Sequence, residues 1–79
     1  MRRELRGHYP AEDSKGRKYG VLVYAVIKEG LAIGDQGGEV EVGTEYLTAS
    51  RLPLDHIDKG EYQIRATGII LKSTDPAAP

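Results

Sequence analysis

The sequence predicts an all-β domain with little or no helix. We expect five to seven short strands that form a small antiparallel barrel or roll, and an SH3-like barrel is the first model. Three observations lead to this prediction. Residues 17–28 are rich in β-branched and aromatic side chains, short alternating segments recur around them, and turns containing glycine or proline separate those segments. The chain has 79 residues, the length of one small domain, and no cysteine, so no disulfide stabilises it.

In the first part of the chain, Leu5–Tyr9 alternates between apolar and polar residues and predicts a short strand with one solvent-exposed face. Pro10–Gly16 contains the residue types of a turn. Arg17–Lys28 has apolar residues on both faces, which predicts a strand covered on two sides, or a long bent strand that serves two parts of a barrel. Gly20 within it indicates a bulge or a close backbone approach.

The glycine-rich segment Gly30–Gly43 predicts a loose hairpin with its tip at Gly34–Gly38. Its second arm, Glu39–Val42, is expected to direct two valines inward and two glutamates outward. Tyr46–Ala49 predicts a short strand, but Thr44 can also cap a single helical turn. Strand and short helix therefore both remain open for residues 44–51.

The last third predicts three further extended segments. A proline limits Leu52–Ile57 to an edge strand or an irregular extended segment, and Asp58–Gly60 predicts a type I turn closed by a left-handed glycine. Glu61–Ala66 alternates cleanly, and Ile69–Leu71 is the last apolar strand. Residues 74–79 have nothing to bury, so we expect one β domain over 1–73 and a disordered tail over 74–79. The predicted core comprises Leu5, Val21, Val23, Tyr24, Ala25, Ile27, Val40, Val42, Leu47, Ile57, Tyr62, Ile64, Ile69 and Leu71.

The net charge is −1, so no overall field attracts nucleic acid or an anionic membrane. The charge is unevenly distributed: residues 1–18 carry six bases and three acids, whereas residues 29–45 carry five acids and no base. These two segments are expected to be solvated faces, or to meet across strands or between subunits. The N-terminus lacks the apolar segment of a secretory signal, and no apolar run is long enough to span a membrane. We therefore expect a cytoplasmic location and no membrane partner.

The residues that carry chemistry are too scattered to predict a catalytic or metal site. The two histidines, His8 and His56, lie 48 positions apart, and none of the three serines lies in a nucleophile elbow. The glycine-rich segment lacks the Gly-Lys-Ser/Thr ending of a phosphate-binding loop and the ligand spacing of a calcium loop. A chain of this size also has little room for a substrate pocket beside its core. We predict no enzyme activity, no catalytic residue, no cofactor and no metal.

A protein-interaction or accessory module is the predicted function, because unpaired strand edges of a small barrel accept partner strands, from another protein or from a second copy. The alternative is a single-stranded nucleic-acid binder that uses an N-terminal face rich in arginine and tyrosine. A third possibility is a subunit that completes the active site of another chain. The candidate binding face consists of Arg2, Arg3, Arg6, His8, Tyr9, Arg17 and Lys18.

The C-terminal third carries a Lys-Gly-x-Tyr-x-Ile motif at Lys59–Ile64 and a Thr-Gly-x-x-Leu-x-Ser-x-Asp-Pro ending at Thr67–Pro76. In these motifs, and in an early stretch Tyr19–Tyr24, the chain resembles a loosely defined group of short bacterial proteins of uncharacterised function. That group usually has Asn where this chain has Asp55. The resemblance implies a bacterial cytosolic β protein, and it carries over no known activity and no catalytic residue.

Overall fold

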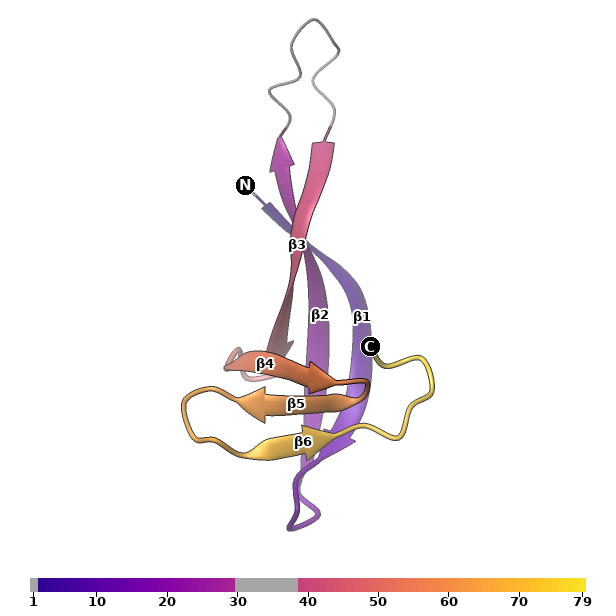
Figure 1. Ribbon diagram of the computed structural model, residues 1–79, viewed down its shortest axis with the longest axis vertical. Coiled ribbons are helices and arrows are strands. Elements are labelled where there is room, and N and C mark those ends of the chain that lie inside the picture. Colours follow the sequence, from indigo (N-terminus) through magenta and orange to yellow (C-terminus); the bar gives the residue numbers. More distant parts are fainter. Residues whose placement is uncertain (1, 30–38) are drawn as a thin grey trace, which may run out of the picture.

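The computed structural model describes residues 2–29 and 39–79, and these residues form a closed antiparallel barrel of six strands without a helix (Figure 1). The strands are β1 Arg2–Glu12, β2 Lys18–Glu29, β3 Glu39–Thr48, β4 Pro53–Asp58, β5 Glu61–Ile64 and β6 Ile70–Lys72. Each strand pairs with the next in the chain, and the single pair Glu12↔Lys72 between β1 and β6 closes the barrel. The predicted small antiparallel barrel is confirmed.

The first three strands are longer than the last three and extend beyond them, which gives the molecule an elongated shape (Figure 1). In Figure 1, β4, β5 and β6 lie across the lower half of β1, β2 and β3. The upper part is a three-stranded sheet made of residues 2–6, 24–29 and 39–45, which we call the arm. The long strand predicted over Arg17–Lys28 is β2, and it serves both the barrel and the arm.

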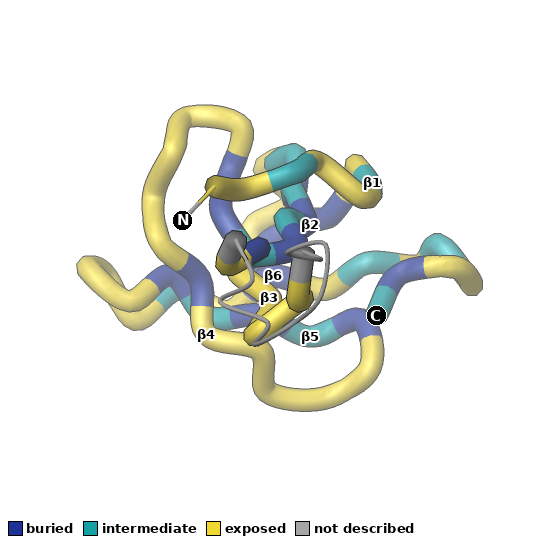
Figure 2. The backbone as a smooth tube through the Cα atoms, turned by 90° about the horizontal axis from the view of Figure 1, so that it is seen from above, coloured by how far each residue is buried: buried dark blue, intermediate teal, exposed yellow. Residues whose placement is uncertain are grey.

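The core fills the barrel below the arm. It consists of Ala11, Val21, Val23, Leu54, Tyr62, Ile64 and Leu71, with Tyr9, Tyr19, Tyr46 and Ile69 packed against it. In Figure 2, viewed from above, short buried stretches alternate with exposed ones along the strands, and the loops that extend furthest outward are mostly exposed. Ala11 and Leu54 were not predicted as core residues, because their segments looked like a turn and an irregular edge.

Several predicted boundaries were wrong. β1 continues through Pro10 to Glu12 rather than ending at Tyr9. Proline is tolerated here because the outer side of β1 has no strand partner among the described residues until Glu12, so no amide donor is needed. Of the two possibilities left open for residues 44–51, the strand is observed: residues 44–48 are the end of β3. The expected hairpin tip at Gly34–Gly38 lies outside the described residues.

Four residues predicted to be in the core are instead exposed: Leu5, Val40, Val42 and Ile57. The prediction placed Val40 and Val42 inward, but they lie in the arm, beyond the barrel core, and both side chains are exposed. By register, Leu5 and Tyr24 share one face of the arm with Val26 and Val40. The opposite face carries Ala25 and Ile27, which are buried. The alternation over Glu39–Val42 therefore predicts a strand correctly, but the inward orientation predicted for its two valines is wrong.

The C-terminal residues, for which the sequence predicts a disordered tail, contact the β4–β5 turn and β5. Ala78 is buried, and the Pro79 carbonyl accepts hydrogen bonds from the Gly60 amide at 2.6 Å and the Tyr62 hydroxyl at 2.7 Å. Lys59 donates from Nζ to the Pro76 carbonyl at 3.0 Å. The segment is held by the turn at Asp58–Gly60, where Gly60 has the predicted left-handed backbone, with a φ of 74°.

Candidate functional site

The residues of the predicted N-terminal binding face do not form one basic surface. Five of them follow β1 from Arg2 to Tyr9 and point to both faces of the sheet, whereas Arg17 and Lys18 lie at the far end of the barrel. Tyr9 is half-buried, and its ring lies over Gly7, where an added Cβ would be 2.6 Å from the Tyr9 hydroxyl. This tyrosine packs against the core rather than offering an open stacking platform.

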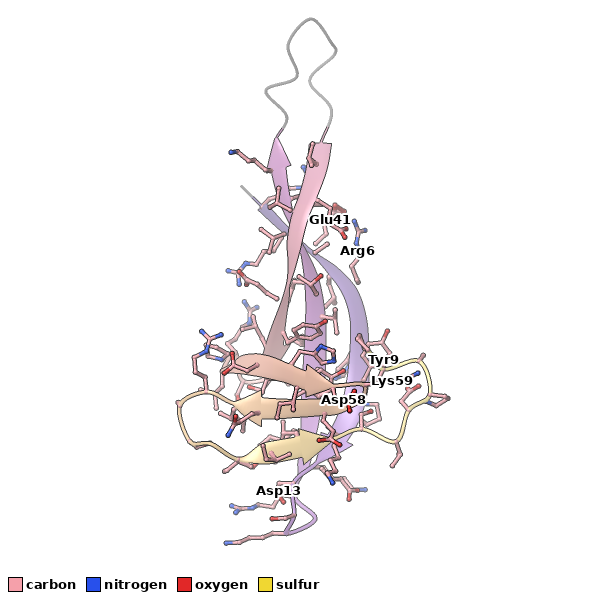
Figure 3. All side chains as sticks on the ribbon, in the orientation of Figure 1. Arg6, Tyr9, Asp13, Glu41, Asp58 and Lys59 are labelled. Carbon is pink, nitrogen blue, oxygen red and sulfur yellow. The ribbon has the colours of Figure 1, made fainter. Side chains whose placement is uncertain are left out.

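The arginines of this predicted face are held by carboxylates. Arg3 Nη1 lies 3.0 Å from Glu45 Oε2, and Arg6 lies 3.5 Å from Glu41 Oε1. Figure 3 shows Arg6 and Glu41 close together on the arm. The basic N-terminal segment and the acidic segment therefore meet across β2 within one chain, which is one of the arrangements that the charge distribution predicts.

A hollow of about 600 Å³ lies where β4 leaves β3 at the base of the arm. Residues from β1, β3, the β3–β4 turn, β4 and the β5–β6 turn line it: Arg3, Thr44, Glu45, Tyr46, Leu47, Arg51, Pro53, Leu54 and Arg65. Three arginines from separate elements thus converge on it. Only Arg3 belongs to the predicted binding face.

The β3–β4 turn places Arg51 at this hollow in an unusual backbone conformation. Arg51 has a φ of 73° and is the one residue other than glycine with a positive φ in the described ranges. Thr48, which is buried, organises the turn: its Oγ1 accepts a hydrogen bond from the Leu52 amide, and its backbone carbonyl accepts one from the Arg51 amide. Such conformations persist where the surrounding bonds impose them, often at functional sites.

Arg65 also lines the hollow, and it binds Asp55. Its Nη2 lies 2.8 Å from Asp55 Oδ1, and its Nε donates to both carboxylate oxygens. These hydrogen bonds lower the pKa of Asp55 below its usual value of 3.8 and raise the pKa of Arg65. Arg3 is held in a similar way by Glu45, and its guanidinium lies 5.9 Å from the centre of the Tyr24 ring.

The hollow lies at the end of an unpaired strand edge. β4 pairs with β3 only at Tyr46 and Leu47, so residues 39–45 pair with β2 on one side and with no other described strand on the other. Such an edge presents backbone donors and acceptors to an incoming chain. Val40 and Val42, each more than half exposed, lie along it.

A second hollow, of about 410 Å³, lies between β1 and β6 and is lined by Pro10, Ala11, Glu12, Asp13, Ser14, Lys18, Ile70, Lys72 and Thr74. Its acids and bases balance. Asp13 already binds the Lys15 and Arg17 amides and the Tyr19 hydroxyl. These groups build the β1–β2 turn, and the lining of this hollow has no net charge, whereas three arginines and one glutamate line the hollow at β3.

His56, one of the two histidines considered as a metal ligand, has a structural role. The His56 ring stacks on Tyr46 with ring centres 5.0 Å apart, and it also contacts Tyr62. Within residues 2–29 and 39–79, no group of three or more His, Asp or Glu side chains is placed to hold a metal ion. No helix in these ranges is long and apolar enough to cross a bilayer.

Comparisons with protein-family models, with curated proteins and with solved structures find no match to this chain. The candidate site therefore stands on geometry alone. Sequence reasoning missed Arg51 because it ends a segment left open between strand and short helix, and it missed Arg65 because that residue lies in the alternating strand predicted over Glu61–Ala66. A signal was present at Arg51, which follows Thr-Ala-Ser and precedes Leu-Pro in a stretch typical of a turn.

Proposed function

We propose that this protein is an interaction module that binds an extended segment of another protein by strand addition at the free edge of β3. The observation that carries the proposal is the unpaired edge 39–45, which continues a sheet already three strands wide. Seven residues span about 23 Å, enough for a strand of ordinary length. Main-chain hydrogen bonds supply affinity in this mode, and pockets for alternate side chains supply specificity.

The opposite edge of the arm is less suited to strand addition. Both edges carry charged residues and one register shift, which falls between Leu5 and Gly7 on β1 and at Val42 on β3, but only β1 contains a proline, Pro10. Charges, bulges and proline are the features that protect sheet edges from pairing. The β3 edge has no proline, and its exposed Val40 and Val42 can pack against side chains of an added strand.

A display library of ten-residue peptides, selected on the full chain, tests this proposal. We expect enrichment of peptides with alternating apolar residues, and loss of about tenfold or more in their affinity for a Val40→Asp, Val42→Asp double variant, because a charge replaces apolar packing on each contact. Leu5→Asp is the matched control, since Leu5 is equally exposed but lies on β1. Strand addition at β3 would be contradicted if Leu5→Asp weakened peptide binding as much as the double variant. It would also be contradicted if NMR chemical shifts changed on β1 rather than β3 when a peptide is added.

Binding of single-stranded nucleic acid remains the alternative function that the sequence predicts. A labelled deoxythymidine oligonucleotide that binds with a steep salt dependence would favour it. We also propose that the barrel has an SH3-like strand arrangement, which is compatible with a binding function because such barrels host many unrelated binding functions. The bacterial and cytoplasmic origin implied by the resemblance remains an expectation, as does the role of a subunit completing another chain's active site.

A further inference from the structure

The hollow at the base of the β3 edge carries one positive charge that no described carboxylate neutralises. Of its three arginines, Arg3 contacts Glu45 and Arg65 contacts Asp55. Among residues 2–29 and 39–79, Arg51 has no ion pair and its guanidinium makes no hydrogen bond. Three guanidiniums and two carboxylates leave a single positive charge, which one further carboxylate would balance.

The backbone at Arg51 gives a second, independent indication. Glycine enters the left-handed region at the least steric cost, and an L side chain such as arginine is strained there. The hydrogen bonds that Thr48 accepts from the amides of residues 51 and 52 would hold a glycine in the same turn equally well. The turn therefore accepts a strained arginine where glycine fits better, and Arg51 is one of the residues that line the hollow.

The position of the hollow defines which part of an added strand would reach it. Beyond residue 45, β3 pairs with β4 at Tyr46 and Leu47, so an added strand must end there. Because β3 runs from Glu39 toward Thr48, a strand added antiparallel to it begins at the hollow and continues toward residue 39. All strand pairs in this barrel are antiparallel, and antiparallel pairs are the commoner kind.

We propose that Arg51 binds the side-chain carboxylate of an Asp or Glu at the N-terminal end of the segment that β3 recruits. This inference rests on the proposed function and names the chemistry of the partner. Arginine presents a planar fork of donors that matches a carboxylate. A nucleic-acid backbone fits less well, because its successive phosphates would run past Glu41 and Glu45 on β3.

The test uses the peptides selected on the full chain, acetylated and amidated at their ends, and the variant Arg51→Gly, which removes the guanidinium and suits the left-handed turn. We expect an acid near the N-terminal end of these peptides. Its replacement by the corresponding amide is expected to weaken binding to the original chain about tenfold or more, the size typical of a charge-assisted hydrogen bond. The same replacement is expected to leave binding to Arg51→Gly unchanged.

The outcomes separate this inference from the proposed function. The role of Arg51 is overturned if the peptides bind at β3 without any preference for an acid. It is also overturned if replacing the acid weakens binding to Arg51→Gly as much as binding to the original chain. Strand addition at β3 stands in both cases. Loss of binding on C-terminal amidation shows a terminal carboxylate in the hollow and overturns the antiparallel orientation. Recovery of no β3-binding peptide overturns both. Urea denaturation of Arg51→Gly, expected to match the original chain or exceed it, shows that any loss of binding is not unfolding.

Discussion

The guanidinium of Arg3, on β1, reaches across β2 to Glu45 on β3, with 3.0 Å between Nη1 and Oε2. Between them lies Tyr24 of β2, whose ring centre is 5.9 Å from the guanidinium carbon. This contact ties the basic start of the chain to its acidic middle and connects all three strands of the arm. Because both side chains are nearly half exposed, at 49% and 45%, water screens the interaction.

We expect the Arg3–Glu45 pair to contribute little to stability. A double-mutant cycle with Arg3→Ala and Glu45→Ala is expected to give a coupling free energy of about 0.2–1 kcal/mol, typical of exposed ion pairs. Half-molar salt should reduce the coupling. The measurement is the free energy of unfolding in urea for the four chains. A coupling well above 1 kcal/mol that salt does not change would show that the contact with Tyr24, rather than the charge pair, dominates.

Replacing Thr48 by valine is expected to destabilise the fold by about 1–1.5 kcal/mol, because the part-buried hydrogen bond from the Leu52 amide to Thr48 Oγ1 is lost while the side-chain volume is kept. Ser50→Ala is the matched control, since it removes only the 2.8 Å contact between the Ser50 and Thr48 hydroxyls. That control is expected to cost less than about 1 kcal/mol. Urea midpoints measure both, and a Thr48→Val chain as stable as the original would disprove the role given to Thr48 in the turn.

Acid is expected to weaken the β1–β2 turn through Asp13. Burial by itself raises the pKa of Asp13, but hydrogen bonds from the Arg17 and Lys15 amides and the Tyr19 hydroxyl outweigh it and lower the pKa below 3.8. Because the folded pKa is depressed, the stabilisation is complete above about pH 4 and is lost as the pH falls through the folded value. Asp13→Asn keeps an acceptor but removes the charge, so we expect a flatter stability profile between pH 5 and 2, measured by thermal unfolding.

Asp55→Asn is the control for this experiment, because Arg65 lowers the pKa of Asp55 in the same direction at an exposed site. The contribution of Asp55 to the pH dependence of stability is expected to shrink in high salt, whereas the contribution of Asp13 is expected to persist. An Asp13→Asn chain with the same slope as the original would show that other carboxylates control acid unfolding.

Removing residues 74–79 is expected to destabilise the barrel, because Ala78 is buried and Pro79 accepts the hydrogen bonds of Gly60 and Tyr62. Tyr62→Phe alone is expected to cost about 0.5–1.5 kcal/mol, the worth of one hydrogen bond, and the truncation more. Both are measured by urea unfolding. A truncated chain as stable as the full chain would support the disordered tail that the sequence predicts.

The same tyrosine provides a spectroscopic test. Burial, with smaller contributions from Tyr46 and Tyr9, raises the pKa of Tyr62 to about 12. Its folded pKa lies above the ordinary value of 10.0, so the associated stabilisation is lost as the pH rises from 10 through 12. Phenolate absorbance should therefore show one tyrosine ionising late in the full chain, and that late step should be absent after truncation.

The sequence by itself determined the class of structure and most of its strands. Alternation of side chains along Arg17–Lys28 and Glu61–Ala66 depends on local geometry, as does the left-handed glycine at Gly60, so these features could be read without knowing the fold. The buried positions Val21, Val23, Tyr62, Ile64 and Leu71 follow from the same pattern.

Only the tertiary structure decided which strand faces are covered and which charged groups meet. Val40 and Val42 have a strand pattern, but the arm extends beyond the layer that would bury them. The hollow at the β3 edge brings together Arg3, Arg51 and Arg65, and Arg51 lies 48 positions from Arg3 along the chain. Contacts over such separations depend on strand length, register and the crossing of β4 over β3, which local sequence patterns do not encode.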